Sequence, residues 1–120
     1  MMNIDKFREI IKQRIHAEEI SHGEWDEEFD RCRQEELQII VEDIPSAIEF
    51  LKNECTADEY SWISEILEDI IEETSSREFL DCYKSLMTKF PEECEKYNIA
   101  GMIQIAEDIL EWGETHGQEN

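Results

Sequence analysis

The stretch TADEYSWISEILEDIIEET, residues 56–74, decides the fold of this 120-residue chain. Its apolar residues recur every three or four positions, which is the spacing of one face of an α-helix. Thr56 and Glu59 have the spacing of a capping box, in which each side chain accepts a hydrogen bond from the other residue's backbone N–H. The pattern predicts one helix over residues 57–74. Its inward face consists of Tyr60, Ile63, Ile66, Leu67, Ile70 and Ile71.

Helical spacing continues from this stretch toward the N-terminus. A first helix is predicted with an apolar stripe from Phe7 to Ile15, and it ends before Ser21. A second stripe runs from Phe29 to Ile44. Proline either breaks a helix or occupies its first turn, so Pro45 interrupts this second helix or starts the next one.

The spacing also continues toward the C-terminus. Ser75 or Ser76 is expected to cap a helix that Pro91 stops. Asn98 is expected to cap the last helix, with Gly113 after its end. The residues of that helix expected to face inward are Ile99, Met102, Ile103, Ala106, Ile109 and Leu110. No segment alternates with the period of a strand, so the sequence predicts a single all-α domain over residues 1–120 with about five to seven helices.

An internal similarity appears when the sequence is shifted by 39 residues. Glu54-Cys55 then coincides with Glu93-Cys94, and residues 68–70 coincide with residues 107–109. A period near 40 is typical of HEAT-type helical hairpins. A repeat over residues 40–112 and a coincidence between similar helix pairs both explain the match. In either case we expect layered antiparallel helix pairs, with the N-terminal helix capping one end.

The charge excludes several classes of function. The chain has 11 Lys and Arg residues and 32 Asp and Glu residues, which gives a net charge of −21. Hydrophobic residues make up 40% of the chain and can fill a core. A protein this acidic repels phosphates and anionic lipids, so we expect no nucleic-acid partner and no membrane partner. No secretory signal is visible, and the four cysteines lack metal-binding spacing. We therefore expect reduced, half-buried thiols and a cytoplasmic protein.

The sequence holds no motif specific to an enzyme. It has no GxGxxG, P-loop, HExxH or GxSxG sequence. Glu19 and His22 have the ExxH spacing of di-iron helices, but that chemistry needs a second such pair, which the chain lacks. We therefore predict no catalytic residue, no metal, no cofactor, no small-molecule substrate and no enzymatic activity.

Acidic residues gather where basic residues are missing. Residues 53–76 contain eight acidic residues and no Lys or Arg. On a helical wheel of residues 57–74, one side opposite the apolar face carries Asp58, Glu65, Asp69 and Glu72, with Trp62 at its border. An indole beside carboxylates suits a surface that binds a basic partner. The alternative is that Trp62 packs against a neighbouring helix and the carboxylates are only solvated.

The last helix repeats this character. Residues 97–120 contain no Lys or Arg. Glu107, Asp108 and Glu111 extend the predicted partner-binding surface, and Trp112 offers a second aromatic side chain or else closes the end of the core. Trp25, which lies among acidic residues near a predicted loop, has the same two interpretations.

Three runs of sequence resemble a known class of protein. They are ECTADEYSWISEILEDI at residues 54–70, SREFL at residues 76–80 and KFPEE at residues 89–93. Together they are similar to small acidic α-helical immunity proteins of bacterial polymorphic toxin and contact-dependent growth-inhibition systems, over roughly residues 26–110. The resemblance implies a cytosolic protein that binds the C-terminal domain of a toxin, often a nuclease, and blocks its active site or substrate groove. It implies no particular interface residue.

A basic toxin domain would suit a chain of this charge, since opposite charges speed association and salt weakens that effect. Two other functions stay open. A helical-repeat adaptor without a toxin partner would bind mainly through apolar contacts, with weak dependence on salt. A carboxylate-rich metal-binding bundle would retain stoichiometric metal and be stabilised by it.

Overall fold

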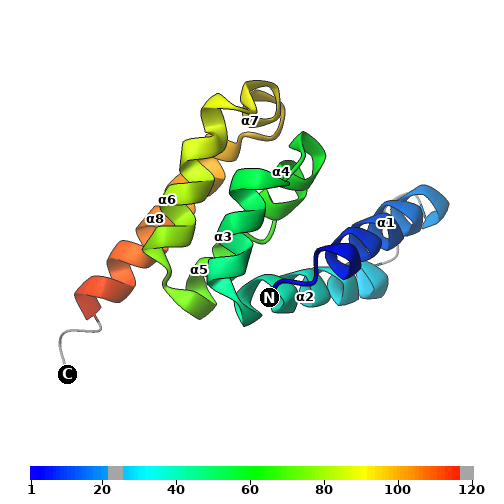
Figure 1. The fold of residues 1–120 in the computed structure, drawn as a ribbon, viewed down its shortest axis with the longest axis horizontal. Coiled ribbons are helices and arrows are strands. Elements are labelled where there is room, and N and C mark those ends of the chain that lie inside the picture. The colour runs from blue at the N-terminus through cyan, green and yellow to red at the C-terminus, as the bar shows by residue number, and fades with distance from the viewer. Residues whose placement is uncertain (22–25, 117–120) are drawn as a thin grey trace.

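The computed structural model describes residues 1–21 and 26–116 of the chain (Figure 1). Within these ranges it contains eight α-helices, one 3₁₀ helix and no strand. The predicted all-α class is confirmed, and the predicted count of five to seven helices is too low. The elements are α1 (Ile4–Ser21), α2 (Asp26–Glu42), α3 (Ile44–Asn53), α4 (Ala57–Ser64), α5 (Leu67–Thr74), α6 (Arg77–Ser85), η1 (Leu86–Thr88), α7 (Pro91–Tyr97) and α8 (Ile99–His116).

The prediction of one helix over residues 57–74 is wrong, because the chain breaks between α4 and α5. The Ile66 backbone leaves the helical region, with φ −111° and ψ 5°. The N–H groups of Glu65 and Ile66 bond to the carbonyls three residues earlier, at 3.3 and 3.0 Å, which tightens the last turn of α4. Arg33 of α2 donates to the Glu65 carbonyl at 3.2 Å, so a contact from another helix satisfies a backbone group that the break releases.

Two further helix ends differ from the predictions. Pro91 does not stop the preceding helix: α6 already ends at Ser85, and Pro91 is the first residue of α7, a position that proline favours. Asn98 directly precedes α8, as predicted for the start of the last helix, and it also ends α7 in the left-handed conformation, at φ 50°. Gly113 lies inside α8, which continues to His116.

The helices pack as layered pairs. Helix α1 packs on α2, α3 packs on α6, and α5 packs on both α2 and α8. In Figure 1, α6 lies in front of α8, and the α1–α2 pair lies at the opposite end of the molecule from the end of α8. Stacked hairpins would bring these same helices together, but the 39-residue repeat itself stays a prediction.

Aromatic pairs occupy the centre of the core. The rings of Tyr60 and Tyr83 stack 4.2 Å apart, and those of Phe7 and Phe50 meet edge to face at 5.7 Å. All four cysteines are free thiols, three buried and one half-buried. Burial raises the pKa of the Cys55 thiol to about 12, so this thiol stays protonated and inert.

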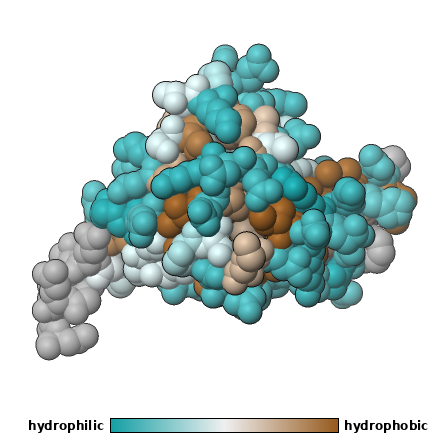
Figure 2. All heavy atoms as spheres, in the orientation of Figure 1, coloured by the Kyte–Doolittle hydropathy of each residue, from teal (hydrophilic) through white to brown (hydrophobic). Residues whose placement is uncertain are grey.

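The apolar pattern predicts most of the core but not all of it. Ile99, Ile103, Ala106 and Leu110 of α8 are buried as expected. Met102 was expected to face inward and is exposed, as is Ile15 of α1. The face seen in Figure 2 is mostly hydrophilic, with separate hydrophobic patches. Among the described helices, none is long and apolar enough to cross a membrane.

A candidate partner-binding groove

A large hollow on the described surface lies between the α1–α2 pair and the body of the molecule. Its volume is about 1010 Å³. Helices α1, α2 and α4 supply most of its lining, and Tyr97 and Met102 contribute from α7 and α8. We call this hollow the groove. It is lined by Arg14, Ile15, Glu18, Glu19, Phe29, Asp30, Arg33, Asp58, Ser61, Trp62, Ser64, Glu65, Tyr97 and Met102.

The groove exposes apolar side chains. Ile15, Tyr97 and Met102 are exposed, while Phe29 and Trp62 are half-buried. They come from five different helices, α1, α2, α4, α7 and α8, so only the folded chain brings them together. Five carboxylates line the same hollow against two guanidiniums. The groove therefore combines apolar contact area with net negative charge.

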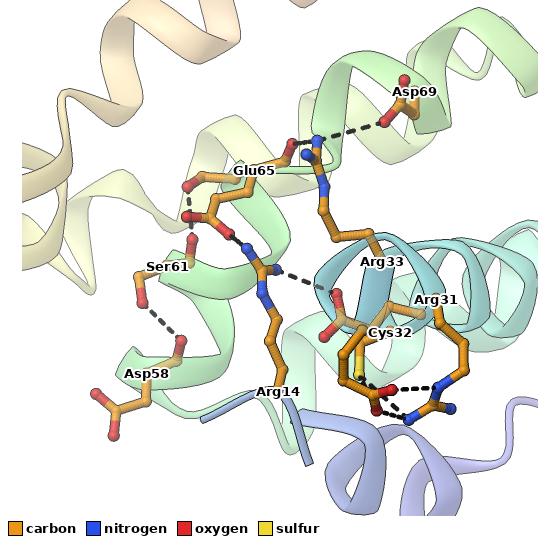
Figure 3. A network of polar contacts seen from close by, with 11 residues as sticks. Arg14, Arg31, Cys32, Arg33, Asp58, Ser61, Glu65 and Asp69 are labelled. Carbon is orange, nitrogen blue, oxygen red and sulfur yellow. Dashed lines mark hydrogen bonds and ion pairs between the residues drawn. The ribbon is translucent and has the colours of Figure 1, made fainter. Parts of the chain in front are cut away.

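Arg14 crosses the groove from α1 to α4. Its guanidinium lies 4.7 Å from the centre of the Trp62 ring and forms an ion pair with Glu65, drawn in Figure 3. It also lies 3.7 Å from the Glu36 carboxylate of α2. This one guanidinium thus links three helices, and carboxylates of the protein itself neutralise its charge.

Glu36 is the most deeply buried carboxyl of the described residues, with 1% of its surface exposed. Neither of its side-chain oxygens has a hydrogen-bond partner among the described residues. Removal from water raises the pKa of this carboxyl to about 7, although Arg14 and Arg33 favour the charged form. Glu36 therefore changes charge near neutral pH, directly behind the groove.

Arg33 is the second cation of the groove. Besides its hydrogen bond to the Glu65 carbonyl, its guanidinium lies 3.9 Å from the Asp69 carboxylate of α5 (Figure 3). Arg33 therefore joins α2 to both sides of the break between α4 and α5. Because both arginines pair with acidic groups, the carboxylates without an ion pair dominate the field that a partner meets.

The predicted partner-binding residues fall in several places. Asp58, Trp62 and Glu65 line the groove, and Asp69 lies beside it through Arg33. Glu72 and Asp108 line a second hollow of about 430 Å³ between α5 and α8, together with Ile71, Ile109 and Trp112. Glu107 pairs with Lys84 at 2.9 Å, and Glu111 is exposed. Trp25 lies outside the described residues.

These positions correct two details of the helical wheel. The wheel assumed one straight helix, whereas the chain breaks at Ile66, so Asp58 and Glu65 line the groove, Glu72 lines the second hollow and Asp69 lines neither. Trp62 is not fully exposed: it is half-buried and covered on one side by Arg14.

Several lining residues were not predicted from the sequence. Glu18, Glu19 and Asp30 supply exposed carboxylates from α1 and α2, and Tyr97 and Met102 supply apolar surface from α7 and α8. The sequence contains no signal for Tyr97 or Met102 at such a site, and Met102 was expected to face inward. The position of α1 and α2 relative to α4 follows from tertiary packing.

Comparisons with models of protein families, with curated proteins and with solved structures find no match to this chain. Among the described residues, no three His, Cys, Asp or Glu side chains converge as metal ligands would.

Proposed function

We propose that this protein is an immunity protein, which binds the basic domain of a cognate bacterial toxin and covers its active or substrate-binding surface. The observation that carries the proposal is the groove, where five carboxylates and exposed apolar side chains share one hollow. On this proposal the protein acts in the cytoplasm.

The charge of the chain supports a basic partner. A net charge of −21 attracts a cationic surface from a distance, and the groove concentrates that attraction between two walls. A toxin that cleaves nucleic acid has to bind phosphates and is therefore cationic at its active face. Carboxylates placed there would occupy the sites that phosphates use.

The apolar lining supports a stable complex. Electrostatic attraction raises the association rate, whereas desolvated apolar and aromatic contacts at the centre of an interface slow dissociation. Exposed Ile15, Tyr97 and Met102 line the same hollow as the carboxylates and can supply such contacts. Fast capture followed by slow release is what neutralisation of a toxin requires.

The same apolar lining favours a second candidate, a protein–protein adaptor without a toxin partner. In that case binding would depend weakly on ionic strength, because apolar contacts are not screened by salt. Immunity and adaptor roles therefore differ in the salt dependence of association.

The test starts from the gene directly upstream of this one. The C-terminal domain of its product is expressed in a bacterial host with and without this protein. The proposal expects that the domain stops growth, that co-expression restores it, and that the two proteins purify as a complex. A domain that is harmless, or one that stays lethal in the presence of this protein, would refute the immunity role.

Two triple variants show whether the groove is responsible. The groove variant carries Glu18→Lys, Glu19→Lys and Asp30→Lys, which reverses exposed carboxylates of the groove. The matched control carries the same charge change at exposed sites that line neither hollow: Glu9→Lys, Glu49→Lys and Glu95→Lys. Only the groove variant should lose protection.

Glu65 and Asp69 are unsuitable for charge reversal. Each faces an arginine, Arg14 or Arg33, so a lysine there would place two cations in contact and disturb the fold. A loss of protection could then result either from a weaker interface or from a disturbed fold.

A further inference from the structure

Helix α8 carries two apolar faces, and only one of them is buried in the core. The buried face consists of Ile99, Ile103, Ala106 and Leu110. A second row, formed by Met102, Ile105, Ile109 and Trp112, follows a spacing of three, four and three residues. At 100° per residue this row lies on one side of the helix, with its centre roughly 110° from the centre of the buried face.

The second row is open to solvent for most of its length. Met102 is 38% exposed, Ile105 is 44% exposed and Trp112 is 64% exposed, whereas Ile109 is half-buried. Single exposed apolar residues are ordinary on a protein surface, but a continuous row of them marks a contact surface. Alternating steps of three and four residues form the seam along which one helix packs on another.

The row runs from the groove to the second hollow. Met102 lines the groove, while Ile109 and Trp112 line the second hollow together with Ile71 of α5. Ile105 lies between them. A ligand that follows the row would therefore reach from the groove to the end of α5.

The charges beside the row select its partner. Glu72 and Asp108 line the second hollow together with Ile109 and Trp112 of the row. No Lys or Arg occurs from residue 97 to residue 120. A second copy of this chain would bring the same carboxylates and its own charge of −21, which disfavours a dimer through this face.

We propose that the outer face of α8 binds an amphipathic helix of a partner protein, with an apolar row at steps of three and four residues and Lys or Arg on both flanks. The distance from Met102 to Trp112 corresponds to about 15 Å, or roughly three helical turns. The apolar row of the partner packs on Met102, Ile105, Ile109 and Trp112, and its basic flanks meet Glu72 and Asp108.

This proposal is independent of the toxin role. It concerns the shape and charge of the segment that α8 binds, whichever protein carries that segment. A growth assay without rescue would leave it standing, and its own test uses no toxin.

The test uses a synthetic helical peptide of about 15 residues as the probe. The peptide carries leucines at steps of three and four residues, with lysines on both sides of that row. A second peptide has the same composition in scrambled order, so that its charge is equal and its row is lost. Binding to the whole protein is measured by calorimetry at about 150 mM salt, and the contact surface is mapped by amide chemical shifts.

The matched variants are Ile105→Ser in the row and Ile20→Ser, an exposed isoleucine of α1 that lines neither hollow. Both sites are exposed, and circular dichroism checks that both variants fold. We expect Ile105→Ser to weaken binding of the ordered peptide by roughly tenfold, while Ile20→Ser leaves it unchanged. Amide shifts should concentrate on α8.

Four outcomes would overturn the proposal. The scrambled peptide could bind as tightly, which would reduce the effect to charge alone. The shifts could avoid α8, or both serine variants could bind like the parent. Finally, sedimentation could show a dimer that Ile105→Ser dissociates, which would make a second copy of the chain the occupant of this face.

Discussion

The Arg14 guanidinium lies over the indole of Trp62, with its central carbon 4.7 Å from the ring centre, and so joins α1 to α4 across the groove. Trp62 also packs against the core. One side of the indole thus supports the fold, and the other side faces the hollow in which we propose that a partner binds.

Replacing Trp62 should therefore affect stability as well as binding. Trp62→Ala removes a half-buried ring and its cation–π contact, and we expect a loss of about 2 kcal/mol in the free energy of unfolding. Trp62→Phe keeps a ring beneath Arg14 and should lose less than half of that. Urea denaturation measures both variants. If Trp62→Ala unfolds at the same urea concentration as the parent, the indole serves only as an external anchor.

Glu36 should make stability depend on pH. Its pKa rises from an ordinary value of 4.5 to about 7 in the folded protein because the carboxyl is buried. The folded protein therefore holds this proton more tightly than the unfolded chain does. The protonated Glu36 carboxyl therefore stabilises the folded state. This contribution to the free energy of unfolding is complete below pH 4.5 and is lost as the pH rises through 7, with a total on the order of 3 kcal/mol.

Glu36→Gln removes this titration while keeping the size of the side chain. Its unfolding free energy should fall less than that of the parent between pH 5 and 8, as measured by urea denaturation at about four pH values. Glu49→Gln, at an exposed site of α3, is the control and should follow the parent. Parallel pH profiles for the parent and Glu36→Gln would contradict the assignment.

Tyr60 and Tyr83 exchange hydrogen bonds. The Tyr60 hydroxyl donates to the Tyr83 carbonyl at 2.8 Å, and the Tyr83 hydroxyl donates to the Tyr60 carbonyl at 2.6 Å. Burial raises the pKa of both hydroxyls, so both remain donors at ordinary pH. Each Tyr→Phe change removes one buried hydrogen bond and should cost about 1 kcal/mol, since the Tyr83 carbonyl, for example, still accepts from the Leu86 N–H.

The double variant of the two tyrosines measures how the bonds depend on each other. The stacked rings hold both hydroxyls in place, so the second change should cost less than it does alone. Thermal or urea denaturation of the parent, the two single variants and the double variant measures the coupling energy between the two hydrogen bonds. Losses that simply add would mean that the two bonds form independently.

Gly113 offers a stabilising substitution. It lies within α8, and a Cβ at this position would meet nothing within 4 Å. Gly113→Ala should raise the free energy of unfolding by about 0.5–1 kcal/mol, because alanine favours the helix. At Gly101 a Cβ would lie 2.6 Å from the Asn98 amide nitrogen, so Gly101→Ala should gain less. A loss of stability in Gly113→Ala would show that α8 ends earlier.

Local features of the fold were readable from the sequence. The Thr56 hydroxyl accepts from the Glu59 N–H at 3.2 Å, and the Glu59 carboxylate accepts from the Thr56 N–H at 2.9 Å, as the capping box predicts. Ser76 caps α6 by accepting from the Phe79 N–H at 3.1 Å. Such contacts involve residues three apart, so their spacing is enough to predict them.

Features that depend on distant residues were not readable. No proline or glycine marks the break at Ile66, where Arg33 of another helix satisfies the Glu65 carbonyl. The groove likewise depends on how α1 and α2 pack against the body. The sequence therefore predicted Asp58 and Trp62 as site residues but not Glu18, Glu19 or Asp30 on the facing helices.

The central claim is that the acidic groove captures a basic partner, and the association rate tests it most directly. The rate is measured between the toxin domain encoded upstream and three proteins, the parent, the groove variant and the matched control, at about 50 and 300 mM salt. We predict that the parent and the matched control associate quickly at low salt and more slowly at high salt. The groove variant should associate roughly tenfold more slowly at low salt, with a weaker dependence on salt. Equal rates for the groove variant and the matched control would contradict the claim.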